Sequence, residues 1–72
     1  MMYSNNILIR FGERVRSLRK LANISIEELS FRSGLNKNYI SDVERGTRNL
    51  SLKAIEKIAR GLNVPIDALF ID

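Results

Sequence analysis

Polar side chains that could bind nucleic-acid bases gather on one face of a short predicted helix, 37–45. At about 100° per residue, the polar face and the apolar face of this segment separate cleanly. The polar face comprises Lys37, Asn38, Ser41 and Arg45, and the apolar face comprises Tyr39, Ile40 and Val43. Lysine can donate to guanine O6 and N7, asparagine can pair with adenine N6 and N7, and serine can bind either base. The alternative is a polar face that is only solvated.

A second short helix must position the first one. Ser25 and Glu28 have the spacing of a capping box, in which the Ser25 hydroxyl accepts from a backbone amide of the first turn and Glu28 reaches back to the Ser25 amide. A helix therefore begins at Ile26. Gly34 supplies the positive φ of a sharp turn, and Asn36 is a good N-cap for the next helix. Two short helices joined across a glycine turn are typical of DNA-reading motifs.

Helical patterns also flank this pair, and strand signals are absent. A helix over about 7–21 carries the apolar stripe Phe11, Val15, Leu18 and Ala22. Ser51 caps a fourth helix, whose predicted buried face is Leu52, Ile55, Ile58, Ala59 and Leu62. Pro65 opens a last short helix, 65–70. The chain is therefore predicted to be all-α.

The composition restricts the possible functions. With 72 residues the chain has room for one small domain, and it contains no Cys and no His. The commonest metal ligand, the commonest general base and the thiol nucleophile are therefore missing. Its acidic residues lack metal-type spacing, and its glycines form no phosphate-cradling loop. We expect neither an enzyme nor a cofactor or metal site.

Charge is distributed unevenly along the chain. Residues 1–49 hold nine of the twelve Lys and Arg residues and five of the eight Asp and Glu residues, so the whole net charge of +4 lies there. Such an asymmetry favours a polyanion-facing part joined to a neutral part, although ordinary solubility charge is the alternative. No run of about 18 apolar residues occurs, and the opening segment does not resemble a secretion signal. These features predict a cytoplasmic protein without membrane contact.

Five segments, spread over nearly the whole chain, share a pattern with a known family. They are FGERVRSLR (11–19), SIEEL (25–29), SGL (33–35), YISDVERG (39–46) and LNVPIDALF (62–70). This pattern resembles the lambda-repressor/Cro-like (XRE) helix-turn-helix family, and the stretch 39–51 is most similar to the controller proteins of restriction-modification systems. The resemblance implies a compact five-helix bundle, a lambda repressor-like DNA-binding domain over 1–72, with its motif at about 26–45 and helix 37–45 in the major groove.

The resemblance also implies roles for individual residues. Combined with the polar face of helix 37–45, it predicts base contacts from Lys37, Asn38, Tyr39, Ser41 and Arg48. Backbone contacts are expected from Ser25, Arg32, Arg45 and Asn49. Tyr39 has an alternative role as a core ring with its hydroxyl at the surface. Matching positions in the family form a partly buried ion pair, which here would be Arg19 and Glu44.

One position departs from the family pattern. The second helix usually starts with Gln, whose amide anchors a phosphate and braces the reading helix, but this chain has Ile26. Because Ile cannot donate a hydrogen bond, we expect the missing contact to be transferred to Ser25, Arg32 or Arg48.

The neutral segment, about 50–72, is predicted to join two subunits. Its apolar residues exceed what one small core needs, and the predicted interface comprises Leu50, Leu52, Val64, Ile66, Leu69 and Phe70. Alternatively, Ile66, Leu69 and Phe70 only cap the core of the monomer. A homodimer would place two reading helices about 34 Å apart and would require a palindromic double-stranded DNA operator.

The leading hypothesis is therefore a transcriptional regulator that acts on its own promoter and on an endonuclease promoter, with RNA polymerase as a further partner. Two alternatives retain the fold. One is a phage or plasmid repressor, or an antitoxin that also binds a toxin. The other is a protein-interaction module that does not bind DNA.

Overall fold

The computed structural model describes residues 3–70, and residues 1–2 and 71–72 lie outside the described part. Its elements are α1 (Tyr3–Leu21), α2 (Ile26–Ser33), α3 (Lys37–Arg45), α4 (Leu52–Leu62) and the 3-10 helix η1 (Ile66–Phe70). Residues 3–70 contain no strand, which confirms the all-α prediction. The prediction of a fifth α-helix is wrong. The segment after Pro65 is too short for an α-helix and closes instead with a tighter bond from the Ala68 amide to the Pro65 carbonyl, 3.0 Å long.

Local capping sets the ends of the three helices that follow α1. Their N-caps are Ser25, Asn36 and Ser51, each of whose side chains accepts a bond from a backbone amide in the first turn. Gly34, Gly46 and Asn63 end these helices in the left-handed conformation. Asn23 adopts the same conformation after α1, with φ of 61°. The helix boundaries at 26, 37 and 52 are therefore confirmed.

Two local expectations differ from the structure. Helix α1 begins at Tyr3 rather than near Ile7, because no Gly or Pro before the apolar stripe ends the helical path. The capping box is half formed. The Ser25 hydroxyl accepts from the Glu28 amide at 3.0 Å, but the Glu28 carboxylate accepts from the Arg32 guanidinium at 2.8 Å, one turn further along.

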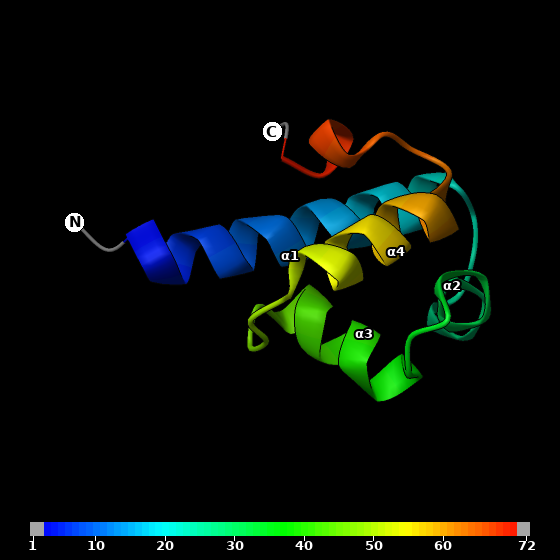
Figure 1. Ribbon diagram of the computed structural model, residues 1–72, viewed down its shortest axis with the longest axis horizontal. Helices are drawn as coiled ribbons and strands as arrows, with labels where there is room; N and C mark the ends of the chain where they lie inside the picture. Colours follow the sequence, from blue (N-terminus) through cyan, green and yellow to red (C-terminus); the bar gives the residue numbers. More distant parts are fainter. Residues whose placement is uncertain (1–2, 71–72) are drawn as a thin grey trace.

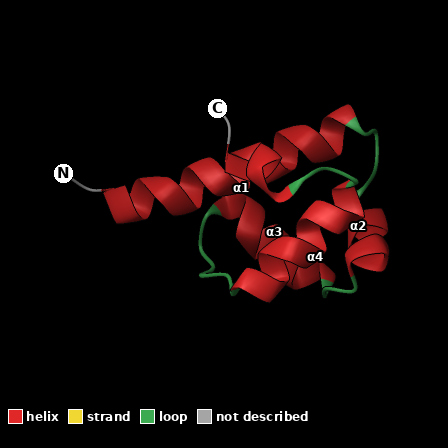
Figure 2. Cartoon of the chain, turned by 45° about the horizontal axis from the view of Figure 1, so that its top comes forward, coloured by secondary structure: helices red, strands yellow, loops and turns green. Residues whose placement is uncertain are grey.

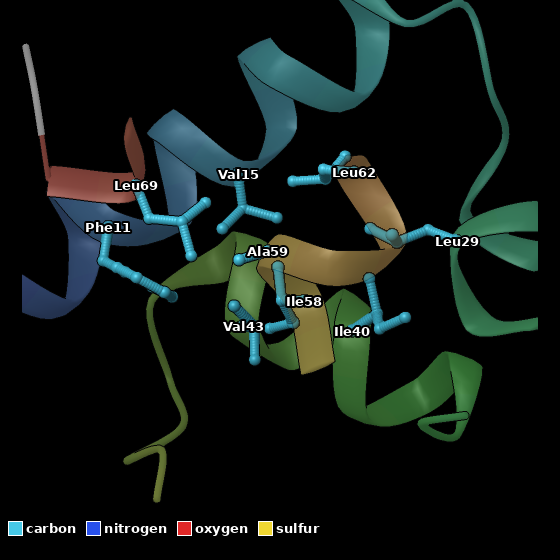
Figure 3. Close-up of a cluster of buried hydrophobic side chains, with 9 residues drawn as sticks. All are labelled: Phe11, Val15, Leu29, Ile40, Val43, Ile58, Ala59, Leu62 and Leu69. Atoms are coloured by element: carbon cyan, nitrogen blue, oxygen red, sulfur yellow. The ribbon is translucent and has the colours of Figure 1, made fainter. Parts of the chain in front are cut away.

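All five elements contribute side chains to one apolar core (Figure 3). The cluster comprises Phe11, Val15, Leu29, Ile40, Val43, Ile58, Ala59, Leu62 and Leu69. Leu18 and Ile55, also predicted to be buried, are partly buried and pack against it, whereas two further residues predicted to be buried are exposed. Ala22 is exposed because α1 ends at Leu21, and Leu52 is 84% exposed because it is the first residue of α4 and points away from the core. Ala54 is buried instead.

The long helix α1 organises the arrangement of the bundle. Helix α3 lies below α1 and η1 lies above it in Figure 1, α4 packs mainly against α2, and the N-terminal end of α1 projects beyond the rest (Figures 1 and 2). Arg14 ties η1 to α1, because its Nε donates to the Ala68 carbonyl at 2.8 Å. Gly12 lets α1 cross α3 closely. A methyl group there would collide with the carbonyl of Val43 and lie 2.8 Å from the carbonyl oxygen of Glu44.

Candidate nucleic-acid interface

The first turns of α2 and α3 face a shared open cleft of about 440 Å³. Its lining comprises Arg19, Ser25, Ile26, Glu27, Lys37, Asn38 and Ser41. Three residues predicted to contact bases and one predicted to contact backbone are thus brought together. Lys37 and Asn38 are exposed, and the Lys37 Nζ lies 3.9 Å from the Glu27 carboxylate. A loose pair between exposed groups leaves the ammonium free to exchange Glu27 for another acceptor.

A second cluster lies at the other end of α3, around Asp42. Its carboxylate binds the Arg45 guanidinium through one oxygen, and its other oxygen lies 3.8 Å from Nη2 of Arg48. The Arg48 guanidinium also covers the Tyr39 ring, with Cζ 4.4 Å from the ring centroid. Arg48, a predicted base contact, and Arg45, a predicted backbone contact, therefore share the carboxylate of Asp42.

Tyr39 combines its two predicted roles. The side chain is half-buried and packs against the core, as the structural alternative requires. Its ring also supports Arg48, a predicted base contact. A ring held by the core is a rigid platform for a flexible arginine.

The ion pair implied by the family resemblance is present. Arg19 Nε and Nη2 donate to the two Glu44 carboxylate oxygens at 2.7 and 3.1 Å. Arg19 Nη1 also donates to the Ile24 carbonyl at 3.0 Å. One guanidinium therefore joins α1, α3 and the loop between α1 and α2. The hydrogen bond to Glu44 raises the pKa of Arg19, and burial only partly opposes it. This pair holds α3 at a fixed angle to α1.

Ile26 replaces a polar anchor with an apolar one. Its side chain is half-buried and packs against the core while also lining the cleft. The start of α2 is therefore held by packing rather than by an amide. Among the residues expected to compensate, Ser25 lies in the cleft and Arg48 in the second cluster.

Two predicted backbone contacts lie apart from both clusters. Arg32 is exposed near the end of α2 and pairs with Glu28 at 2.8 Å. Asn49 lines an apolar groove of about 160 Å³ with residues of α1, α4 and η1. Neither residue lines the cleft, because the cleft opens at the start of α2, whereas Arg32 lies near the end of α2 and Asn49 lies in the loop after α3.

Sequence reasoning missed Glu27 and Asp42, the two carboxylates on these clusters. Each lies beside a cation predicted to contact DNA. The three-residue spacing of Asp42 and Arg45 on one helix could have indicated that pair. The approach of Glu27 to Lys37 depends on the angle between α2 and α3, for which the sequence carries no local signal.

The residues of the predicted subunit interface range from exposed to fully buried. Leu52 is 84% exposed, and Ile66 and Phe70 are about half exposed, whereas Leu50 and Val64 are half-buried. Leu69 is 1% exposed and belongs to the core of the monomer, so its assignment to the interface is wrong. Its side chain fills the space between α1 and α4 that η1 covers (Figure 3).

Three apolar residues that were not predicted extend this surface. Two neighbouring grooves share Ile55, and the first is also lined by Ile7 and Leu8 of α1. The second is lined by Leu52 and Ile66. An almost continuous apolar surface thus joins α1, α4 and η1.

No group of three or more acidic, His or Cys side chains within the described residues could hold a metal ion. Within residues 3–70, no helix has the length and apolarity needed to cross a bilayer.

The fold and the two clusters on α3 define a helix-turn-helix protein. The family model described as helix-turn-helix matches residues 15–69, and the chain belongs to this family. Control protein C.BamHI of Bacillus amyloliquefaciens is 52% identical over 68 residues, which are 92% of this chain and 84% of the relative. The resemblance to controller proteins of restriction-modification systems is thus confirmed.

Solved structures of controller proteins agree. The chain is similar to C.AhdI from Aeromonas hydrophila, with a TM-score of 0.88 and 45% identity, over 90% of this chain and 98% of that one. It is also similar to C.Esp1396I, solved as a tetramer in complex with its natural 35 base-pair operator. The TM-score is 0.82 at 33% identity, over 88% of this chain and 83% of that one.

Proposed function

We propose that this protein is a sequence-specific transcriptional regulator that controls a restriction-modification system through its own promoter and that of the endonuclease. The observation that carries the proposal is the exposed polar start of α3, where Lys37 and Asn38 share an open cleft with Ser25. This face carries the donors that base edges accept.

The two clusters divide the work of recognition. Lys37, Asn38 and Ser41 face base edges from the first turns of α3, and Arg48, supported by Tyr39, reaches bases from the following loop. Ser25 and Arg45 bind phosphates on either side, with Arg32 and Asn49 as outer backbone contacts. Phosphate contacts fix the register, and base contacts supply the sequence preference.

The functional unit in this proposal is a homodimer joined through the apolar surface of α1, α4 and η1. Leu52, Ile66 and Phe70 expose large apolar side chains that a monomer has no reason to leave in water together. A two-fold axis through this surface repeats α3 and matches a palindromic operator. The tetramer of C.Esp1396I on its operator supports assembly on DNA.

Selection of duplexes from a random pool tests the proposal, with the bound complex sized in the same experiment. We expect one palindromic sequence to be enriched and two chains to bind each palindrome. Affinity should fall steeply with salt, by about 0.9 log units per log unit of salt for each phosphate contact. Enrichment of no sequence, with affinity independent of salt, would instead indicate a protein-interaction module.

Variants separate the assigned roles. Asn38→Ala should lower the preference for one base pair in each half-site, by about 1–3 kcal/mol. Arg45→Ala should weaken binding to all duplexes equally and reduce the salt dependence. Arg60→Ala is the matched control, because it removes one charge from an exposed position at the end of α4, away from α3, and should change neither property.

Regulation in both directions requires RNA polymerase as a second partner. We expect transcription from the selected operator to rise at low regulator concentration and to fall at high concentration in a reaction with purified polymerase. Repression at every concentration would assign the protein to the repressors that share this fold.

A further inference from the structure

One acidic side chain stands among the cations of the proposed DNA surface. Asp42 lies on α3, and its side chain is 31% exposed. One carboxylate oxygen binds Arg45 and the other lies 3.8 Å from Arg48. Both oxygens are therefore already engaged by guanidinium groups.

The backbone of Asp42 also holds the loop that carries Arg48. The Asp42 carbonyl accepts from the Thr47 amide at 3.0 Å and from the Thr47 hydroxyl at 3.2 Å. The loop is thus tied to the helix one residue before Arg48. Side chain and backbone of the same residue act together to place the Arg48 guanidinium over the Tyr39 ring.

We propose that Asp42 is a specificity-determining residue that acts through Arg48, by holding this arginine for base contact and withholding it from phosphates. The inference rests on the proposed function, since it concerns how the same surface separates the operator from other DNA. Direct reading of a cytosine amino group by Asp42 is the competing role, and it would appear as a preference lost at a single base pair.

The difference between operator affinity and affinity for other DNA arises from whether the Asp42 carboxylate keeps a cationic partner in the complex. On the operator, Arg48 keeps its place between Asp42 and Tyr39 while its remaining donors meet a base edge. On unrelated DNA no base accepts these donors, and Arg48 reaches a phosphate only by leaving Asp42, which Arg45 leaves in both complexes. The abandoned carboxylate then faces phosphates without a partner, which weakens nonspecific binding more than operator binding.

Asp42→Asn tests this inference, because the amide keeps the shape of the side chain and loses its charge. We expect affinity for unrelated duplexes to rise by roughly three- to tenfold, the worth of one or two exposed ion pairs. Operator affinity should change by less, so the ratio of the two affinities falls. Glu13→Gln, which removes one exposed charge from α1, is the matched control and should leave this ratio unchanged.

A double-mutant cycle shows whether Asp42 acts through Arg48. The fall in the affinity ratio should disappear when Asp42→Asn is made in an Arg48→Ala background. The same fall in both backgrounds would overturn the inference, as would a loss of preference at a single base pair caused by Asp42→Asn alone. An unchanged ratio in Asp42→Asn would overturn it as well. Failure of the proposed function is distinct, because it would appear as a wild-type protein that prefers no sequence.

A measurement without DNA tests the placement of Arg48 separately. In side-chain NMR spectra of the free protein, the Nε–H signal of Arg48 should be shifted by the Tyr39 ring current. Asp42→Asn should move this signal toward the position shared by solvated arginines, whereas Glu13→Gln should not. An Arg48 signal that is the same in wild type and Asp42→Asn would contradict the inference whatever the DNA results.

Discussion

At the scale of single residues, the charged side chains of this protein differ in burial and in how tightly they are paired. The Arg19 and Glu44 side chains are 11% and 6% exposed and meet through two hydrogen bonds. The cations Lys37, Arg45 and Arg48, predicted to bind DNA, are 45% to 67% exposed. Lys37 and Arg48 lie 3.9 and 3.8 Å from the nearest carboxylate oxygen, and Arg45 pairs with a residue one turn earlier on the same helix. A buried pair resists exchange, whereas an exposed pair yields to a phosphate at small cost.

Glu44→Gln should therefore destabilise the protein by about 2–3 kcal/mol, because it leaves Arg19 charged and partly buried without its carboxylate. The raised pKa of Arg19 keeps it protonated until the pH exceeds the ordinary range for arginine. Its charge is thus constant over roughly pH 6 to 9, and so is the loss. Chemical denaturation measures the change. Glu56→Gln, which breaks an exposed pair on α4, should cost less than about 0.5 kcal/mol.

Ile26→Gln should restore a phosphate anchor at the expense of packing. We expect stability to fall by about 1 kcal/mol, since a half-buried apolar contact is lost. Affinity for all duplexes should rise by about three- to tenfold through one hydrogen bond to a charged acceptor. Glutamine is neutral, so the salt dependence of binding should not change. Ile26→Ala is the control, and an equal rise in affinity there would refute the role of the amide.

At the scale of elements, two glycines with the same conformation have different surroundings. Gly34 and Gly46 have φ of 76° and 77°. A methyl group on Gly34 would meet nothing within 4 Å, whereas one on Gly46 would lie 2.8 Å from the Ile9 backbone. Gly46 thus ends α3 and also lets the loop before Arg48 pass close to α1.

Alanine substitutions should separate these two effects. Gly34→Ala should cost about 1 kcal/mol, because only the left-handed conformation opposes it. Gly46→Ala should cost at least about 2 kcal/mol, since α1 must also shift. Thermal unfolding of both variants measures the difference. Equal losses would show that the approach of Ile9 to Gly46 carries no energetic weight.

The ends of these elements were predictable from the sequence, because their signals are local. Ser25, Asn36 and Ser51 cap the helices they precede, and the left-handed residues follow them at the expected places. The 3-10 form of η1 was not predictable, and the burial of Leu69 was one of two alternatives that the sequence left open, since both depend on how η1 packs against α1 and α4. At the proposed DNA surface, the polar face of α3 could be predicted from helical periodicity. The Asp42 cluster could not, because it requires the loop after Gly46 to fold back over Tyr39.

At the scale of the whole molecule, the proposed DNA surface and the apolar surface use different parts of one small bundle. The first lies on α3, the start of α2 and the loop after α3, and the second joins α1, α4 and η1, with Asn49 of that loop also lining one of its grooves. Exposed apolar side chains alone do not identify the interface, because Phe31 on α2 is as exposed as Leu52 on α4, both at 84%. The distinction is that Leu52 borders other apolar residues in a groove.

Leu52→Glu and Phe31→Glu should therefore differ in their effect on assembly. Both place a charge at a position already in water, so neither should lower the stability of the folded monomer by more than about 0.5 kcal/mol. Only Leu52→Glu should convert the proposed dimer to a monomer in sedimentation equilibrium, because only there would two charges be buried together across the proposed two-fold axis. Operator affinity should then fall by at least about tenfold, since the half-sites are no longer bound by linked helices. A Leu52→Glu protein that remained dimeric would place the subunit contact elsewhere on the molecule.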